Sequence, residues 1–203
     1  MRRMIPFIGV LLAAVGVGAC GGGRPIRYYT VELPPAPQPS TSVYPVTLLI
    51  GRIGAPGILQ DEPIAYRSGP NEIGTYDYHH WVEPPVRMLK VILIRQLRAS
   101  GKFQSVAELG SSAQGELVLQ GRLYDFEEVD AGSTAALVTM EFELLDRKTG
   151  KIVWTHFYSH REPVQGKEIS DVVSALDHNL VRGLTEVAFG LDVYFSAHVP
   201  GKS

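Results

Sequence analysis

Apolar and polar residues alternate most regularly over residues 116–161. In the middle of this stretch, Thr139, Glu141 and Glu143 share one face, and the opposite face is apolar, made of Ala136, Val138, Met140, Phe142 and Leu144. A period of two with one polar face predicts antiparallel strands that pack their other face on a core. Turns at 130–133 and 146–151 divide the stretch, and glycine at position 150 adopts positive φ without strain. The pattern predicts a three-strand meander.

Two other segments repeat apolar residues at helical spacing, which predicts two amphipathic helices. The first, over 84–100, has Pro85 in its first turn and Gly101 as a stop. The second runs from Ser170, a plausible N-cap, to about Leu191. The apolar stripes are Val86, Leu89, Leu93 and Leu97 in the first helix and Val173, Leu176, Leu180, Leu184, Val187 and Leu191 in the second.

Shorter apolar runs predict additional strands at 46–50 and 64–67, an extended piece within 68–80, and an edge strand at 103–106. Residues 54–63 are rich in glycine, proline and polar residues, which favours a loop. We therefore predict an α+β fold, in which a largely antiparallel sheet with a three-strand meander is packed by two amphipathic helices.

The first twenty residues have the layout of a secretory signal. Arg2 and Arg3 precede an apolar run, and two small residues then lead to Cys20. The run is short for a membrane span, which takes roughly 20 apolar residues. The tetrad Val17-Gly18-Ala19-Cys20 resembles a bacterial lipobox. The resemblance implies cleavage before Cys20, a diacylglycerol thioether on its sulfur and an acyl chain such as palmitate on its new amino group.

Two alternatives remain for this segment: an ordinary secretory signal followed by a free cysteine, and an uncleaved membrane helix. The lipobox interpretation divides the chain into a signal peptide (1–19), a lipidated tether (20–45) and a folded domain (46–203). The tether contains a proline-rich stretch at 34–45, which favours extended backbone and is most simply a passive spacer.

Charge and cysteine content exclude several classes of function. The net charge of −2 shows no electrostatic footprint for nucleic acid. The single cysteine, once lipidated, leaves the mature domain without a thiol, so thiol catalysis and cysteine-ligated metals are excluded. We predict no cofactor apart from the covalent lipid on Cys20.

No catalytic or metal-binding motif appears in the chain. A P-loop, a nucleophile elbow, an HExxH helix and a dinucleotide glycine fingerprint are all missing from the sequence. Among the six histidines, His79 and His80 are neighbours that point to opposite sides of an extended chain. His156 and His160 share a strand face, but four residues of strand separate them by roughly 13 Å. We therefore predict no metal site.

Two carboxylate pairs are the remaining candidates for acid–base chemistry. Glu141 and Glu143 lie on the polar face of a predicted strand, where a solvated surface explains them, and Glu127 and Glu128 lie beside a turn. Without a constellation of nucleophile, base and stabilising donors, the chain is predicted not to be an enzyme.

The most distinctive stretch is the aromatic segment from Tyr76 to Pro85, just before the first helix. Aromatic side chains combine large contact area with a polar group and are favoured at binding sites. We therefore predict that this segment is a contact surface for a partner. The alternative for its tryptophan is that the ring holds the segment onto the start of the helix. The candidate contact residues are Tyr66, Tyr76, Tyr78, His80, Trp81 and Glu83.

Taken in order, these motifs resemble the ABC-type transport auxiliary lipoprotein family over essentially the whole mature chain. They are the lipobox, Tyr28-Tyr29-Thr30-Val31, Val46–Ile50, Ala65-Tyr66-Arg67, the spaced set Tyr76, Trp81, Glu83 and Pro85, the hairpin from Asp146 to Trp154, and the C-terminal helix. The long proline tract departs from the family pattern.

The resemblance implies a function that composition alone does not. Members of this family are lipoproteins of Gram-negative envelopes that work with periplasmic MCE-domain proteins and ABC permeases to move lipids or other hydrophobic molecules. The chain would be a non-catalytic docking or tethering component. Gly21 follows Cys20, where aspartate is the usual signal for inner-membrane retention, so the expected location is the periplasmic face of the outer membrane.

A second hypothesis is an envelope-assembly or structural lipoprotein that binds another outer-membrane protein or a cell-wall polymer. A third hypothesis is an enzyme. The oligomeric state, the transported molecule and its direction of travel stay open at this point.

Overall fold

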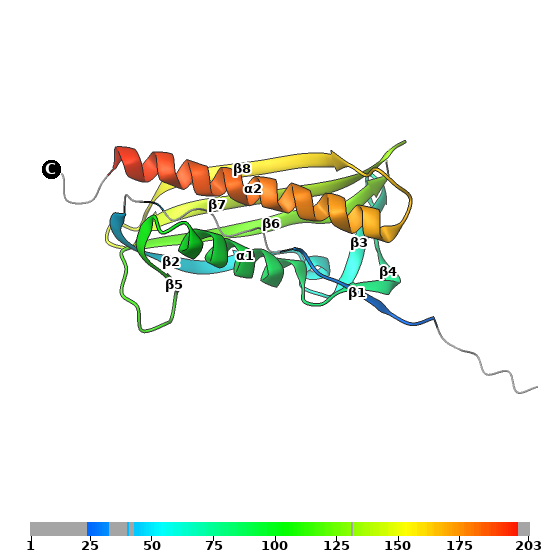
Figure 1. Ribbon diagram of the computed structural model, residues 1–203, viewed down its shortest axis with the longest axis horizontal. Coiled ribbons are helices and arrows are strands. Elements are labelled where there is room, and N and C mark those ends of the chain that lie inside the picture. The colour runs from blue at the N-terminus through cyan, green and yellow to red at the C-terminus, as the bar shows by residue number, and fades with distance from the viewer. Residues whose placement is uncertain (1–23, 33–39, 41–42, 131, 199–203) are drawn as a thin grey trace, which may run out of the picture.

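The computed structural model describes residues 24–32, 40, 43–130 and 132–198, so the predicted signal peptide, Cys20 and most of the proline tract lie outside it. Figure 1 shows eight strands and two α-helices. The predicted α+β class is confirmed. In chain order the elements are β1 (Arg27–Tyr29), β2 (Tyr44–Gly54), the 3₁₀ turn η1 (Gly57–Leu59), β3 (Pro63–Gly69), β4 (Glu72–Trp81), α1 (Pro85–Ala99), β5 (Phe103–Glu108), β6 (Leu117–Asp130), β7 (Thr134–Asp146), β8 (Lys151–Pro163) and α2 (Ile169–Ala197).

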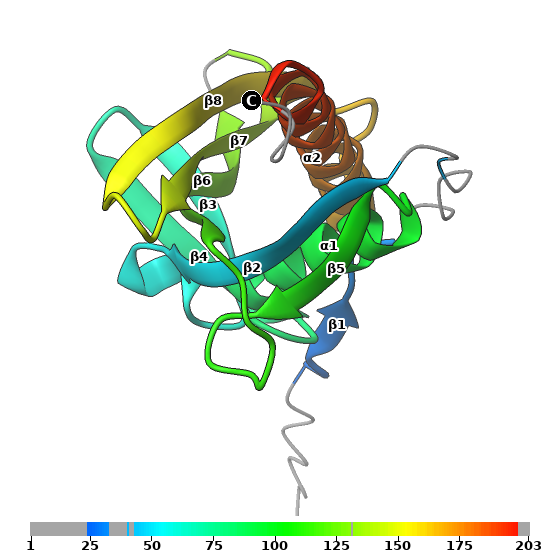
Figure 2. The same cartoon turned by 90° about the vertical axis from the view of Figure 1, so that its left-hand side faces the viewer.

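Strand β6 organises the sheet because both of its edges are occupied. One edge pairs with β7 in antiparallel register from Leu117 to Asp130, and β7 pairs in turn with β8, so the predicted meander is confirmed. The other edge pairs in parallel with β2 near its start and with β3 near its end. The sheet is therefore mixed, and its path runs β1-β4-β3-β6-β2-β5. Seen from one end, it curves around the core, and the helices lie across its open side (Figure 2).

The strand that the sequence analysis predicts at 103–106 is β5, which lies at the edge of the sheet as predicted. The first strand was not predicted as part of the sheet. Residues 27–29, within the predicted tether, form β1 and pair in parallel with β4, and Val31 just after them is only 4% exposed. The packed part of the chain therefore begins upstream of residue 46.

Helix α1 follows its predicted limits closely. Pro85 stands at its start, where a missing N–H costs no hydrogen bond, and Gly101 follows its C-cap with φ of 61°.

Helix α2 differs from its prediction at both ends. Ser170 is not the N-cap: Glu168 is, and it forms a capping box with Asp171, whose carboxylate accepts the Glu168 N–H at 2.9 Å. The helix also continues past Leu191 to Ala197, because Phe195 extends the apolar stripe by one more step of four and is fully buried. In the part of the chain that the structure describes, no helix is both long and apolar enough to cross a bilayer.

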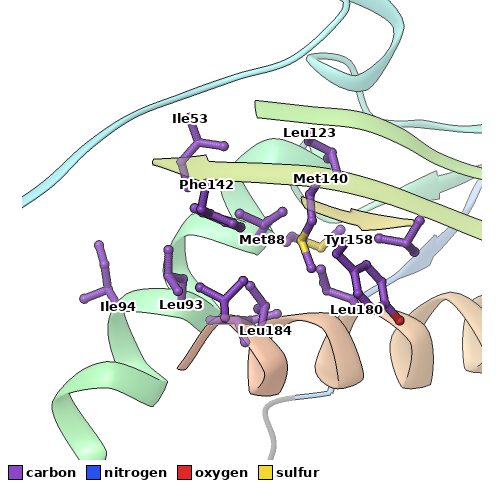
Figure 3. Packing of buried hydrophobic residues seen from close by; sticks show 14 of the residues in the cluster. Ile53, Met88, Leu93, Ile94, Leu123, Met140, Phe142, Tyr158, Leu180 and Leu184 are labelled. Atoms are coloured by element: carbon purple, nitrogen blue, oxygen red, sulfur yellow. The ribbon is translucent and has the colours of Figure 1, made fainter. Parts of the chain in front are cut away.

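The core lies between the curved sheet and the two helices. Side chains from all three layers meet there, with Met140 and Phe142 from β7 facing Met88 and Leu93 of α1 and Leu184 of α2 (Figure 3). The predicted inward face of β7 is confirmed, since Ala136, Val138, Met140, Phe142 and Leu144 are each at most 1% exposed.

Close approach of α2 to the sheet depends on Gly183. A Cβ atom at this position would collide with the side chains of Met140 and Tyr158, so any larger residue would push the helix away from β7 and β8.

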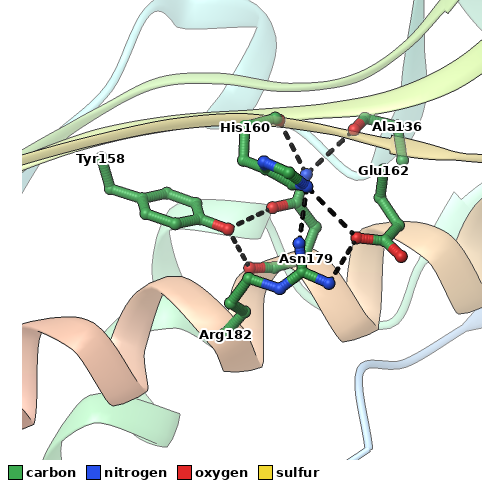
Figure 4. A network of polar contacts seen from close by, with 6 residues as sticks. All are labelled: Ala136, Tyr158, His160, Glu162, Asn179 and Arg182. Carbon is green, nitrogen blue, oxygen red and sulfur yellow. Dashed lines mark hydrogen bonds and ion pairs between the residues drawn. The ribbon is translucent and has the colours of Figure 1, made fainter.

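One buried polar side chain fixes α2 against the meander (Figure 4). The amide of Asn179 donates to the backbone oxygens of Ala136 at 2.9 Å and His160 at 2.8 Å. Its oxygen accepts the Tyr158 hydroxyl at 2.6 Å. The residue is fully buried with every group paired, so it specifies one register of the helix on the strands.

This arrangement predicts that Asn179→Ala lowers the free energy of unfolding by about 3 kcal/mol, because it removes the two hydrogen bonds to buried backbone carbonyls and one of the two acceptors of the Tyr158 hydroxyl. Tyr158→Phe removes only one hydroxyl and should cost about 1 kcal/mol. Urea denaturation of both variants measures the difference. Equal losses for the two would contradict the assigned role of Asn179.

Candidate functional site

The aromatic segment before α1 is a strand and not a loop. Tyr76 to Trp81 belong to β4, but their pairing with β3 is irregular: Ala65 pairs with Thr75, whereas Pro63 pairs with His80. Residues 76–79 of β4 therefore face Ile64 alone on β3. Such a bulge re-aims side chains, which explains how Tyr76 and His79, three residues apart, come into edge contact at 5.8 Å.

Tyr66 and Tyr76, two of the predicted contact residues, pack against each other with ring centroids 5.0 Å apart. The Tyr76 hydroxyl donates to Glu128 at 2.8 Å, and burial together with this carboxylate raises the pKa of Tyr76. Beside them, Tyr29 from β1 meets His79, its hydroxyl 2.9 Å from Nδ1. This cluster joins three strands, and contact of Tyr66 and Tyr76 with a partner stays a prediction.

Trp81 does not belong to the exposed surface. Its ring is fully buried and packs on Phe126 with centroids 5.3 Å apart. The alternative interpretation, in which this ring holds the segment in place before α1, agrees with that position. The ring N–H finds no hydrogen-bond partner in the structure. The prediction that Trp81 contacts a partner is therefore corrected, because its side chain is not exposed on the surface.

The other predicted residues remain accessible. Tyr78 is 41% exposed, Glu83 is exposed and His80 is half-buried. The ring of His80 lies 5.9 Å from that of Tyr28 on β1, in an edge contact. The structure thus divides the predicted set into the inner pair Tyr66 and Tyr76, a buried tryptophan and an outer group at the β1–β4 pair.

The N-terminal segment is held to the domain beyond β1 itself. The N–H of Val82 donates to the Tyr29 oxygen at 2.8 Å, and the N–H of Glu32 bonds to the carboxylate of Asp177 on α2. Burial raises the pKa of Asp177, against the effect of that N–H. Sequence reasoning missed this docking because a three-residue strand has no detectable period.

The two carboxylate pairs have structural partners. Glu127 is 1% exposed and accepts from Arg67 Nε at 2.5 Å, and burial raises its pKa despite that partner. Glu128 holds Tyr76, and Glu141 accepts from the Tyr124 hydroxyl at 2.7 Å. Burial of Glu127 could not be predicted, because a carboxylate beside a turn is usually solvated.

The strand histidines are separate from each other. His156 stacks on Trp154 with centroids 5.8 Å apart, and His160 lies 2.6 Å from Arg182 of α2. Among the described residues, no three histidine, aspartate or glutamate side chains come together as metal ligands would.

Strand β8 forms a long open edge that the sequence analysis did not identify as a site. Within the described chain it pairs with β7 alone. Phe157 on this strand is 61% exposed, and Phe189 on the neighbouring helix α2 is 68% exposed. The sequence did carry a signal, since Phe189 lies off the apolar stripe of α2 and Phe157 lies on the face opposite Tyr158.

A family model described as the ABC-type transport auxiliary lipoprotein component matches residues 29–188. The fold is similar to that of the crystal structure of protein XCC0632 from Xanthomonas campestris, of family DUF330, with 22% identity over 85% of this chain and 97% of that one and a TM-score of 0.76. A crystal structure titled only "uncharacterized protein" shares 13% identity, covers 82% of this chain and 99% of that one, and gives a TM-score of 0.65. No curated protein sequence matches this chain.

The ion pair between Arg67 and the buried Glu127 predicts that the stability of the protein depends on pH. Arg67→Met should cost about 2 kcal/mol of stability near pH 7, somewhat less than for a fully buried pair because the Arg67 side chain is 28% exposed. Without Arg67, the pKa of Glu127 rises further, so the folded chain keeps a proton that the unfolded chain loses. Stability then falls as pH rises from the ordinary carboxyl value toward the raised one, and the loss relative to the parent protein should shrink near pH 4.

Urea titrations at the two pH values measure this effect. Lys148→Met, which removes the exposed ion pair with Glu116, is the matched control and should change stability by less than about 1 kcal/mol. A cost for Arg67→Met that does not depend on pH would contradict the assigned burial of Glu127.

Proposed function

The chain belongs to the ABC-type transport auxiliary lipoprotein family, and on this premise we propose that it is a non-catalytic docking component of an envelope transport system. It is anchored through lipid on Cys20 at the periplasmic face of the outer membrane. Its partners are an MCE-domain periplasmic protein and the associated ABC permease, and the cargo is a lipid or another hydrophobic molecule. Cys20 lies outside the described residues, so the anchor rests on the lipobox and on the family.

The observation that carries the docking role is the open edge of β8. An unpaired strand edge presents backbone N–H and C=O groups to any chain that can add a strand, and proteins usually protect such edges with charges, proline or a bulge. The central outward residues of β8 are Thr155, Phe157 and Ser159, none of which is charged. The partner we propose adds a strand to this edge and makes apolar contacts with Phe157 of β8 and with Phe189 of α2, both of which are exposed.

The absence of catalysis is part of the same proposal. The carboxylates that sequence reasoning raised as acid–base candidates have structural partners, and Glu127 is closed off from solvent. An auxiliary component of an ABC system needs no ATPase motif of its own, and the chain has none.

Lipid attachment has a direct test. Cys20→Ser removes the only thiol, so the protein should lose label from radioactive palmitate. The mass of the native N-terminal peptide should show a diacylglycerol and an acyl chain on Cys20. A Cys20→Ser protein that still takes up palmitate label would contradict a lipid anchor on this residue.

Docking is tested by native pull-down of the lipidated protein in mild detergent, with mass spectrometry of what is recovered. We expect an MCE-domain protein and its ABC partners. Phe157→Asp combined with Phe189→Asp should lower their recovery at least about tenfold, which corresponds to 1.4 kcal/mol of binding.

Leu109→Asp is the matched control, because Leu109 is 48% exposed and lies on the far side of the sheet from β8 in the strand order. Undiminished recovery with the double variant would place the interface elsewhere. Recovery of only outer-membrane assembly proteins or wall fragments would favour the structural-lipoprotein hypothesis.

A further inference from the structure

The outer side of the β1–β4 pair carries a compact exposed surface, which we call the tether face: Ile26, Tyr28, Tyr78 and His80. The parallel register pairs Tyr28 with His80 directly, and their rings are 5.9 Å apart. Tyr78 precedes His80 by two residues and Ile26 precedes Tyr28 by two, so all four lie at neighbouring positions of the β1–β4 pair. Ile26, Tyr28 and Tyr78 are 45%, 58% and 41% exposed, so three large side chains are open to solvent on two paired strands. A group of exposed apolar side chains marks a surface that contacts another molecule or a membrane.

The segment of chain that leads to the tether face is positively charged. Arg24 and Arg27 are both exposed, and no acidic residue occurs between Cys20 and Val31. Asp77 is the nearest acid along β4, and Glu83 follows just after the strand; both are exposed.

The tether face lies next to the point where the chain leaves for its anchor. Cys20 precedes Arg27 by seven residues, which span at most about 25 Å when fully extended. β1 also lies beside the start of α2, since a cavity of about 460 Å³ at this end is lined by Arg27, Tyr29, His79 and Ile169. Helix α2 has 29 residues and so runs roughly 43 Å away from that end. One end of the domain is therefore held near the bilayer, and the other is kept far from it.

We propose that the tether face lies in the headgroup layer of the anchoring membrane and sets the orientation of the domain on it. Tyrosine favours the membrane–water interface because its ring is apolar and its hydroxyl is polar, and isoleucine reaches the acyl boundary. Arg24 and Arg27 are placed to bind lipid phosphates. The occupant is a bilayer and not a protein, because a partner at this face would have to fit within the short reach of the tether. The proposal rests on the proposed lipid anchor at Cys20.

The test uses the lipidated protein in vesicles of phosphatidylethanolamine and phosphatidylglycerol with no other protein present. Because the native cysteine carries the lipid, Tyr78→Cys creates a single labelling site for an environment-sensitive fluorophore. Brominated acyl chains should quench this label, and its emission should shift to the blue. Lys148→Cys, in the β7–β8 turn at the opposite end of the domain, is the control and should show several-fold weaker quenching (Figure 1).

A second pair of variants tests the charge contribution. Arg24→Glu with Arg27→Glu should reduce quenching at position 78, whereas Arg95→Glu with Arg161→Glu, which changes two exposed arginines elsewhere, should not. Both pairs alter exposed side chains, so folding is retained and is checked by circular dichroism.

Vesicle flotation distinguishes failure of the tether-face proposal from failure of the lipid anchor. Protein that floats but shows equal quenching at positions 78 and 148, or none at either, would overturn the tether-face proposal and leave the anchor intact. Native protein that fails to float would remove the lipid anchor, and the membrane orientation would fall with it.

Discussion

The architecture depends on one strand having both of its edges occupied. β6 holds β7 along its whole length on one side and divides its other side between β2 and β3. β2 and β3 are therefore joined to the meander through the single backbone of β6, and displacing either of them would unpair part of one edge of β6. Phe126 on this strand also supports Trp81 of β4, so the packing before α1 is built on the same element.

Because β6 pairs with strands on both edges, different surfaces of the domain lie at different ends of it. The strands β3, β4 and β1 gather at one end of it, with the tyrosine cluster and the tether face. The meander β6–β7–β8 extends to the opposite end and leaves an open edge on its outer strand. In the proposed arrangement, the attachment at one end and the open strand edge along the length of the domain give the membrane and the partner separate places, and the two do not compete.

Much of this fold could be predicted from the sequence, and the exceptions have definite causes. The meander and both helices were predictable because a burial face of period two or 3.6 is written into residues such as Val138 and Leu184. The parallel pairing of β2 and β3 with β6 was not, since register between distant strands leaves no local pattern. The N-cap of α2 was placed two residues late, because Glu168 caps through its own side chain in a box with Asp171, whereas Ser170 is the more usual capping type.

The candidate site was predictable only as a region. The aromatic segment stood out by composition, but which rings face solvent depends on the bulge opposite Ile64, and no spacing rule reveals that Trp81 turns inward while Tyr78 turns out. Phe157 and Phe189 were missed for a different reason. Each is a single apolar residue on an otherwise polar face. Such a residue indicates a contact site only when the structure shows that the strand beside it lacks a partner.

The parallel pairing of β1 with β4 also has a mechanical consequence. With the proposed anchor at Cys20, a pull toward the membrane would reach the domain through β1 and act along the ladder, loading its three residue pairs together. A hairpin pulled from its open end would lose its pairs one at a time. Val31 and the bond from Glu32 to Asp177 lie behind the ladder and share the same load. Tension on the proposed anchor would therefore be passed into the sheet and helix α2 as shear, with the residue pairs loaded together and not one at a time.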